Sequence, residues 1–259
     1  MPALKQKAKS DGGVQAVALA LQIIEALAFR GPQSVTELAK QLGTTKTRIF
    51  NYLRTLVEHG YATQDPETER YGVGYRAAQI GGAVANEFDL VSVSRAPMTR
   101  IHQEFGHTVV LSKFDNSAIY CAAQIEGTGT LKISIPMGYV LGFHATAQGK
   151  VALAFGPPSL LETVIEKGLK PVTKATIIAP DRLRKEVATV RKRGWATAPN
   201  QAMARLDTLS VPIINKSRRF VGALAIIMFA EDMAKQPMEH ELAALQQAAA
   251  EISAALALS

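Results

Sequence analysis

The sequence predicts the α+β fold class, in which a small helical unit with a β-hairpin precedes a larger domain of antiparallel strands and helices. Two observations lead to this prediction. Residues 14–59 contain three helical patterns separated by glycine-containing turns, and two short strand-like segments follow them. Residues 108–229 contain several further strand-like segments, which turn residues join and helical patterns flank. We therefore expect two domains, with a boundary near residue 88.

The composition is typical of a soluble globular protein, because 47% of the residues are hydrophobic and 20% are charged. Cys121 is the one cysteine in the sequence, which excludes an intramolecular disulfide and a cysteine-rich zinc site. A reducing, cytoplasmic setting is therefore expected. No apolar run reaches the roughly 20 residues that span a bilayer, so we expect no membrane association.

The net charge of +7 suits a partner that carries phosphate groups. The excess of positive charge is spread over both halves of the sequence, so it permits nucleic-acid binding without identifying a surface for it. Residues 1–13 are polar, contain lysines and end in two glycines. We expect a disordered basic arm there, and no signal peptide, because no apolar core follows the lysines.

The first domain begins with a helix that we expect at residues 14–30. It is apolar almost all round, so more than one of its faces should be buried, and a partner chain is one way to bury them. A capping-box pattern, Ser34-Val-Thr-Glu37, opens a second helix, which Gly43 ends. A third helix is expected from Thr45 to about residue 59. Two short helices joined by a glycine-containing turn are the sequence form of a helix-turn-helix.

Two short strands are expected next, at residues 61–64 and 70–73. The stretch between them, Asp65-Pro-Glu-Thr-Glu69, supplies turn residues, so the sequence predicts a hairpin that forms the wing of a winged helix-turn-helix. The expected segments of the whole chain are the basic arm at 1–13, the winged helix-turn-helix at 14–75, a linker helix at 76–90 and a second domain at 91–259.

The third helix carries the candidate DNA-reading surface. Ile49, Tyr52, Leu53 and Leu56 form a core-facing stripe, and hydroxyl, amide and guanidinium groups occupy the other faces. Such groups can reach base edges and phosphates in a major groove, although an ordinary solvated face would look similar. The capping box, the glycine turn and the hairpin together favour DNA reading. The candidate DNA-binding residues are Ser34, Thr44, Thr45, Lys46, Thr47, Arg48, Asn51, Arg54, Thr55 and Arg70.

The second domain mixes strands and helices. Strands are expected at residues 108–114, 118–124, 130–135, 195–199, 208–214 and 220–229. Helices are expected at residues 91–105, 144–155, 159–167, 181–193 and 238–258.

The segment His144-Ala-Thr-Ala-Gln-Gly-Lys150 is the most distinctive part of this domain. Thr146 can cap a helix there, and the small residues around it keep side-chain bulk low. Open backbone N–H groups at such a helix start can bind an anion, for example a carboxylate. The small residues can equally serve to pack the helix tightly against a sheet, and the spacing alone leaves both interpretations open.

Several positions form a recognisable set across both domains. In the first domain they are Val14-Gln15, Ile24–Leu27, Ser34–Ala39, Leu42-Gly43, Lys46, Leu53, Thr55-Leu56, Asp65–Thr68 and Arg70-Tyr71. In the second domain they are His144–Lys150, Arg193–Ala196 and Val211-Pro212. Together they resemble the IclR family of bacterial transcription regulators, in the right order, from about residue 14 to 258. The resemblance implies a DNA-binding winged helix-turn-helix and a GAF-like effector-binding domain.

The sequence departs from the family pattern on the expected reading surface. Thr47-Arg48 and Asn51 stand where members commonly carry Ser-Thr and a later arginine, so the operator sequence should differ. Glu69 stands where the wing tip usually has glycine. Its negative charge would oppose a close approach of the wing to phosphates, although Arg70 could still touch the backbone.

The resemblance also implies an effector pocket. Family members have an acidic residue and serines at several of its positions, where this sequence has alanine or isoleucine. The pocket should therefore be more apolar, which favours an aromatic or longer organic acid over a small keto acid, with the carboxylate at the Ala147 and Gln148 amides. The candidate effector-binding residues are Thr130, Ile133, Ala147, Gln148, Ala198, Thr208, Ala225 and Ile227.

Two classes of function remain to be separated. The sequence shows no nucleophile–base pair, no phosphate-binding loop, no dinucleotide fingerprint and no zinc-like histidine spacing. We therefore expect no enzyme, no cofactor and no metal, but a regulator that binds double-stranded operator DNA and an organic acid as a homodimer or homotetramer. One alternative is an enzyme with an N-terminal interaction module, and such an enzyme would change a small organic acid chemically. The other alternative is a DNA-binding protein without a ligand.

Overall fold

The structure, a computed structural model, describes residues 14–86, 89–129, 133–229 and 238–256. The expected basic arm at 1–13 lies outside the described residues. The chain divides into two compact units, Met1–Glu87 and Phe88–Ser259, each of which is described by itself below.

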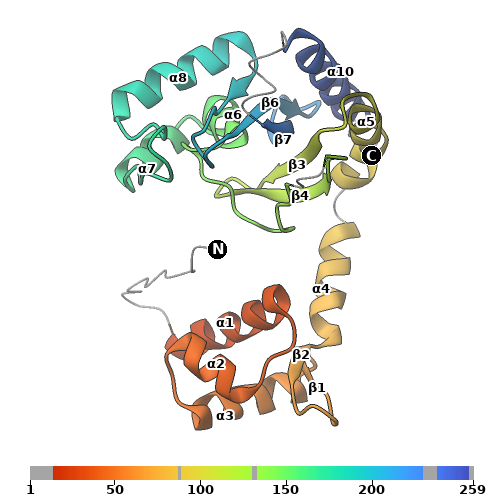
Figure 1. Ribbon diagram of the computed structural model, residues 1–259, viewed down its shortest axis with the longest axis vertical. Coiled ribbons are helices and arrows are strands. Elements are labelled where there is room, and N and C mark those ends of the chain that lie inside the picture. Colours follow the sequence, from red (N-terminus) through yellow and green to blue (C-terminus); the bar gives the residue numbers. More distant parts are fainter. Residues whose placement is uncertain (1–13, 87–88, 130–132, 230–237, 257–259) are drawn as a thin grey trace. The chain divides into compact units, whose positions relative to one another are not determined.

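The N-terminal unit is a helix-turn-helix followed by a hairpin, as predicted (Figure 1). Strands β1 and β2 pair in antiparallel register, from Ala62 opposite Val73 to Gln64 opposite Tyr71. The turn between α2 and α3 contains Gly43, whose φ of 63° lies in the left-handed region that glycine adopts without strain. The elements are α1 (Gln15–Arg30), α2 (Val35–Leu42), α3 (Lys46–Glu58), β1 (Ala62–Gln64), β2 (Tyr71–Val73) and α4 (Tyr75–Asn86).

Helix α1 buries one face in the core of this unit, where Ile23 and Leu27 pack with residues of α2 and α3. Val17, Leu21 and Phe29 on the same helix are exposed. The expectation that more than one face is buried is therefore not met within this unit, and burial against a partner chain stays a prediction.

The described part of the expected linker segment is helical. Helix α4 ends at Asn86, and residues 89 and 90 belong to the following helix, α5 (Asp89–Phe105). Residues 76–86, 89 and 90 are therefore helical as expected, and residues 87 and 88 lie outside the described residues.

The C-terminal unit is a five-stranded antiparallel sheet with helices on both faces, which confirms the α+β class. The strand order is β4-β3-β7-β6-β5. Figure 1 shows α5 and α10 on one side of this sheet and α6, α7 and α8 on the other. Besides α5, its elements are β3 (Thr108–Phe114), β4 (Ile119–Ile125), α6 (Ala147–Phe155), α7 (Leu160–Glu166), α8 (Pro180–Arg193), β5 (Ala196–Thr197), β6 (Leu206–Ile214), β7 (Phe220–Phe229) and α10 (Glu239–Ala255).

Alternating side chains give the sheet two apolar faces. Leu209 and Ile226 pack in the cluster that includes residues of α5 and α10. Ala223 packs with Val151 of α6 and Val190 of α8 on the opposite face. Because successive side chains of a strand point to opposite faces, Ala225 and Ile227 are directed to the α6 side with Ala223.

One expected strand is wrong in its described part. Residues 130–132 lie outside the described residues, and Ile133–Ile135 are not a strand. The edge of β4 is instead bridged by the segment at 138–141, where the Cys121 N–H donates to the Tyr139 carbonyl at 3.0 Å. Side chains hold the 133–135 segment: the Thr108 hydroxyl donates to the Ile133 carbonyl, and the Ile135 N–H donates to the side-chain oxygen of Gln124.

At the other side of the sheet, β5 pairs with β6 only at Leu209 and Ser210 in the described part of the chain. Beyond this pairing the outer edge of β6 contains Pro212, which has no N–H, and proline fits a strand where no donor is needed. The N–H of Ile214 donates to the Ser253 hydroxyl of α10 at 3.3 Å. The donors at this edge are therefore absent or already bonded.

Candidate functional site

Helix α3 presents most of the predicted DNA-binding residues on one exposed surface. Ile49, Leu53 and Leu56 are buried, so the helix has a fixed inner face. The Thr45 hydroxyl caps its start by accepting the Arg48 N–H at 3.3 Å. Thr44 is half-buried before the helix, and the exposed candidates are Thr45, Lys46, Thr47, Arg48, Asn51, Arg54 and Thr55.

The cations of α3 are available for an external partner. Within the part of the chain that the structure describes, Lys46, Arg48 and Arg54 form no ion pair. The Arg48 guanidinium lies 5.9 Å from the centre of the Tyr52 ring, one helical turn away. The surface therefore combines unpaired guanidinium and ammonium groups with hydroxyls and an amide, which are donors and acceptors for phosphates and base edges.

Ser34 has a structural role at the start of α2. Its hydroxyl accepts the Glu37 N–H at 3.3 Å, and the Glu37 carboxylate accepts the Ser34 N–H at 2.7 Å. This is the predicted capping box, and the structure confirms it. The Ser34 N–H bond lowers the pKa of the Glu37 carboxyl, so the acceptor stays ionised.

Arg70 connects the hairpin to α2. Its guanidinium donates to the Glu37 carboxylate at 2.8 Å and to the Pro32 carbonyl at 3.1 Å. The sequence did not reveal this contact, because Arg70 and Glu37 are far apart along the chain. These bonds occupy part of a guanidinium that was predicted to touch DNA, and a phosphate contact by Arg70 stays a prediction.

The wing tip is held by a side-chain turn. One Asp65 carboxylate oxygen accepts the N–H groups of Glu67 and Thr68, at 2.8 and 3.1 Å, and the first of these bonds contributes most to lowering the pKa of the Asp65 carboxyl. Glu69 follows with a φ of 54°, in the left-handed region. This backbone explains why glycine suits the position, since a side chain there costs conformational energy.

Replacing Glu69 by glycine should stabilise the N-terminal unit. Relief of the left-handed strain is worth about 1–2 kcal/mol, and the greater freedom of glycine in the unfolded chain offsets about 0.4–1 kcal/mol of it. Denaturant unfolding followed by far-ultraviolet circular dichroism should show the difference of these two terms, a net gain of up to about 1.6 kcal/mol. The Glu69→Gln variant removes the charge but keeps the side chain, so it should show no such gain. A less stable Glu69→Gly variant would contradict the expectation.

Helix α6 has Thr146 as its cap, as predicted, but it begins at Ala147 and not at residue 144. The Thr146 hydroxyl accepts the Gly149 N–H at 3.0 Å and donates to the Gly142 carbonyl at 2.9 Å. Ala147 and Gln148 are buried, and their N–H groups have no acceptor among the described residues. The start of the helix therefore retains donors that an anion could use.

The structure gathers the other candidate effector residues on the α6 side of the sheet, although not in one cluster. Ala147 and Ala198 pack in the cluster around Val151. Ile227 packs with Val110 and Cys121, and Ile133 contacts this second cluster. Thr208, half-buried, pairs with Ile227 across β6 and β7, whereas Thr130 lies outside the described residues.

The second of these clusters is apolar throughout. Burial raises the pKa of the Cys121 thiol to about 11, so the thiol is protonated and behaves as a small apolar side chain. Ala225, the neighbour of Ile227 two residues earlier on the same face, is fully buried. This surface can hold hydrocarbon and offers few polar contacts.

Two buried ionisable residues, Lys150 and Asp207, bind the backbone of residues 197 and 198, and neither was among the predicted site residues. Lys150 is 1% exposed, and its ammonium donates to the Thr197 carbonyl at 2.8 Å and lies 3.6 Å from the Glu186 carboxylate. Burial lowers the pKa of Lys150. Asp207 accepts the N–H groups of Ala198 and Thr208, and burial raises the pKa of its carboxyl. In the sequence, Lys150 stands out as the one charged residue of the α6 segment, and this is the feature that could have pointed to a buried ion pair.

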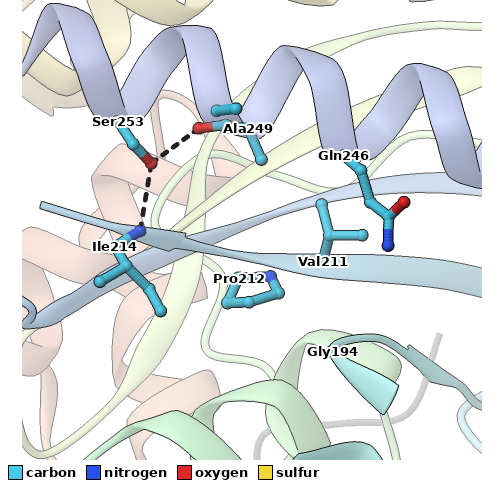
Figure 2. A pocket seen from close by; sticks show the side chains of 8 residues that line it. Gly194, Val211, Pro212, Ile214, Gln246, Ala249 and Ser253 are labelled. Atoms are coloured by element: carbon cyan, nitrogen blue, oxygen red, sulfur yellow. Dashed lines mark hydrogen bonds between the residues drawn. The ribbon is translucent and has the colours of Figure 1, made fainter.

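The structure also contains a pocket of about 230 Å³ at a different place, between α10 and the outer edge of β6. Figure 2 shows the Ser253 side chain in this pocket, hydrogen-bonded to Ala249 and Ile214. None of the candidate effector residues lines it. Its lining consists of Gly194, Val211, Pro212, Ile214, Gln246, Ala249, Ala250 and Ser253.

The described residues contain no candidate membrane span and no candidate metal site. No described helix is both long and apolar enough to cross a membrane. No group of three or more histidine, cysteine, aspartate or glutamate side chains within the described ranges could hold a metal ion.

Two family models match the chain. The model for the bacterial transcriptional regulator IclR C-terminal domain matches residues 82–254, and the IclR helix-turn-helix model matches residues 16–66. The transcriptional repressor IclR of Escherichia coli (strain K12) is 28% identical over 224 residues, which cover 85% of this chain and 81% of the relative. The regulator XynR of the same organism is 26% identical over 245 residues, which cover 94% and 97% of the two chains.

Solved structures share the fold. The IclR structure from Thermotoga maritima has a TM-score of 0.76 at 26% identity and covers 93% of this chain and 98% of its own. An IclR homolog from Microbacterium hydrocarbonoxydans, complexed with 4-hydroxybenzoate, has a TM-score of 0.82 at 20% identity and covers 94% and 100% of the two chains.

Proposed function

The chain belongs to the IclR family of bacterial transcriptional regulators, and on this premise we propose that it controls a catabolic operon in response to a bulky, preferably aromatic, organic acid. The observation that carries the proposal is the capped helix α3, with its buried inner face and its outer surface of exposed polar side chains. A helix of this kind can enter a major groove and read base edges there.

In the proposed complex, two copies of α3 from a homodimer or homotetramer read the two halves of an operator. Asn51 can pair with adenine, and Arg48 or Arg54 with guanine, through two hydrogen bonds each. Lys46 and the hydroxyls at the start of the helix contact phosphates, where the helix dipole adds to the attraction. One small domain offers too little contact for tight binding by itself, so two reading helices are needed.

The effector half of the proposal rests on the α6 side of the sheet. The carboxylate of the acid would bind the free N–H groups of Ala147 and Gln148, and its body would contact Ala225, Ile227 and Ala198. The Microbacterium protein of the same fold is in complex with 4-hydroxybenzoate, an aromatic acid, which supports this choice of ligand class. Binding would favour one arrangement of the effector domains and so change how two reading helices fit DNA.

The DNA half is tested with duplexes selected by the full-length protein from a randomised library. On the selected duplex, Asn51→Ala should weaken binding by about 1–3 kcal/mol, roughly 5- to 150-fold, and relax the preference for one base. Gln41→Ala removes an exposed amide from α2 and should leave the sequence preference unchanged. Equal weakening of Asn51→Ala on selected and random DNA would show a phosphate contact instead of base reading.

The effector half is tested on the same protein–DNA complex. Benzoate-type acids should bind in calorimetry, change the affinity for the selected duplex and be recovered chemically unchanged. Tight binding of pyruvate or glyoxylate without binding of benzoate would contradict the proposed ligand class. Conversion of the acid to a product would support the enzyme alternative.

A further inference from the structure

Phe50 of α3 is a large aromatic side chain on the surface that is proposed to read DNA. It is 49% exposed, although helix α3 has a well-formed inner face. The apolar cluster of the N-terminal unit includes Ile49 and Leu53, the helix neighbours of Phe50 on the inner side, but Phe50 is not part of it. The packing of the unit therefore gives no reason for an aromatic residue at this position.

The position of Phe50 on the helix places it beside candidate base-reading residues. Residues three and four apart are neighbours on a helix surface, so Phe50 lies next to Thr47 on one side and Arg54 on the other. Asn51 follows it directly. All these residues belong to the first half of α3 or its middle turn, close to the capped start that a recognition helix directs into the groove.

We infer that Phe50 recognises the 5-methyl group of a thymine in the major groove. This inference rests on the proposed function, because it requires that α3 enters DNA. The thymine methyl is the apolar group that distinguishes the major-groove edge of an A·T pair, and phenylalanine is one of the side chains suited to contact it. The contact would remove exposed apolar surface of Phe50 and of the methyl from water, which is favourable.

The neighbouring amide complements this contact. Asn51 can bind the adenine N6 and N7 atoms, so Phe50 and Asn51 together fit a stretch of A·T pairs. A half-site read by α3 should therefore contain at least one thymine whose methyl group matters, in addition to an adenine contacted by Asn51.

The test uses the full-length protein and a duplex that it selects from a randomised library. Each thymine of the half-site is replaced in turn by deoxyuridine, which removes only the methyl group. At one thymine, wild-type protein should lose about fourfold in affinity, the effect of one buried methyl group. Phe50→Ala should bind the thymine duplex more weakly and be insensitive to deoxyuridine at that position, whereas Phe50→Leu should keep part of the sensitivity.

Val57→Ala is the matched control, because Val57 is another exposed apolar residue of α3, 39% exposed, two turns further from the capped start. It should keep the full methyl effect, and thermal unfolding should show that all variants are folded. If no thymine is sensitive to loss of its methyl group, or if the sensitivity persists in Phe50→Ala, the inference is overturned while selective DNA binding still stands. If Phe50→Ala changes the oligomeric state in size-exclusion chromatography, Phe50 is a protein contact instead. A library from which no sequence is enriched contradicts both this inference and the proposed function.

Discussion

Replacing Gly149 by alanine should destabilise the C-terminal domain by about 3 kcal/mol, the upper part of the usual range for overpacking. A Cβ atom at Gly149 would lie 2.4 Å from the Gly142 carbonyl oxygen and 2.6 Å from the Phe143 Cα atom. Both neighbours are backbone atoms, so no side chain can move aside. Trp195 is the one tryptophan in the sequence and belongs to this domain, so its fluorescence during denaturant unfolding measures the loss.

Gly142→Ala is the control for this experiment. A Cβ atom there would meet the Ala145 Cβ at 3.6 Å, an ordinary contact, so this variant should unfold close to wild type. A Gly149→Ala variant with the unfolding midpoint of wild type would show that the loop at residues 142–143 can move away from α6 at little cost.

Leu53→Ala should destabilise the N-terminal domain by about 2–5 kcal/mol and abolish DNA binding. Leu53 is fully buried in the cluster that joins α1, α2 and α3, and a small domain has little stability to lose. Gel-shift assays on the selected duplex measure the binding, and circular dichroism measures the loss of helix.

The Trp195 unfolding transition should be nearly unchanged in Leu53→Ala, because all the described residues of the apolar cluster around Leu53 belong to the N-terminal unit. Val57→Ala, which truncates an exposed side chain of the same helix, should keep both DNA binding and stability. Unchanged DNA affinity in Leu53→Ala would mean that the core closes around the cavity without disturbing α3.

Local patterns allowed much of the fold to be predicted. The capping box of Ser34 and Glu37, the left-handed Gly43 and the cap at Thr45 depend on residues within a few positions of one another. Strands β3 and β7 have the predicted bounds, since turn residues delimit their apolar runs. Short-range hydrogen bonds and burial therefore determine these elements.

Long-range contacts explain what the sequence could not show. The ion pair of Arg70 with Glu37 joins the hairpin to α2, and the bond from Lys150 to Thr197 joins α6 to β5. Such pairs depend on tertiary structure and have no fixed spacing. The segment at 133–135 looked like a strand because its apolar residues suit one, but tertiary pairing gives the β4 edge to residues 138–141.

Of the small residues at the start of α6, Gly149 has a clear packing role. Gly149 is needed for close packing, because the backbone of Gly142 and Phe143 occupies the space that a side chain would fill. The N–H groups of Ala147 and Gln148 have no acceptor in the described part of the chain, so anion binding there stays a proposal. The motif therefore has a packing requirement at one residue, whatever the adjacent residues bind.

The outer edge of β6 has a consequence for how copies of this protein can associate. A free strand edge with unbonded donors is a template on which another chain can add a strand and start aggregation. Pro212 offers no donor at this edge, and Ser253 already accepts the donor of Ile214. A continuous intermolecular sheet through this edge is therefore disfavoured, and copies that meet here would have to associate through side chains, such as those of α10.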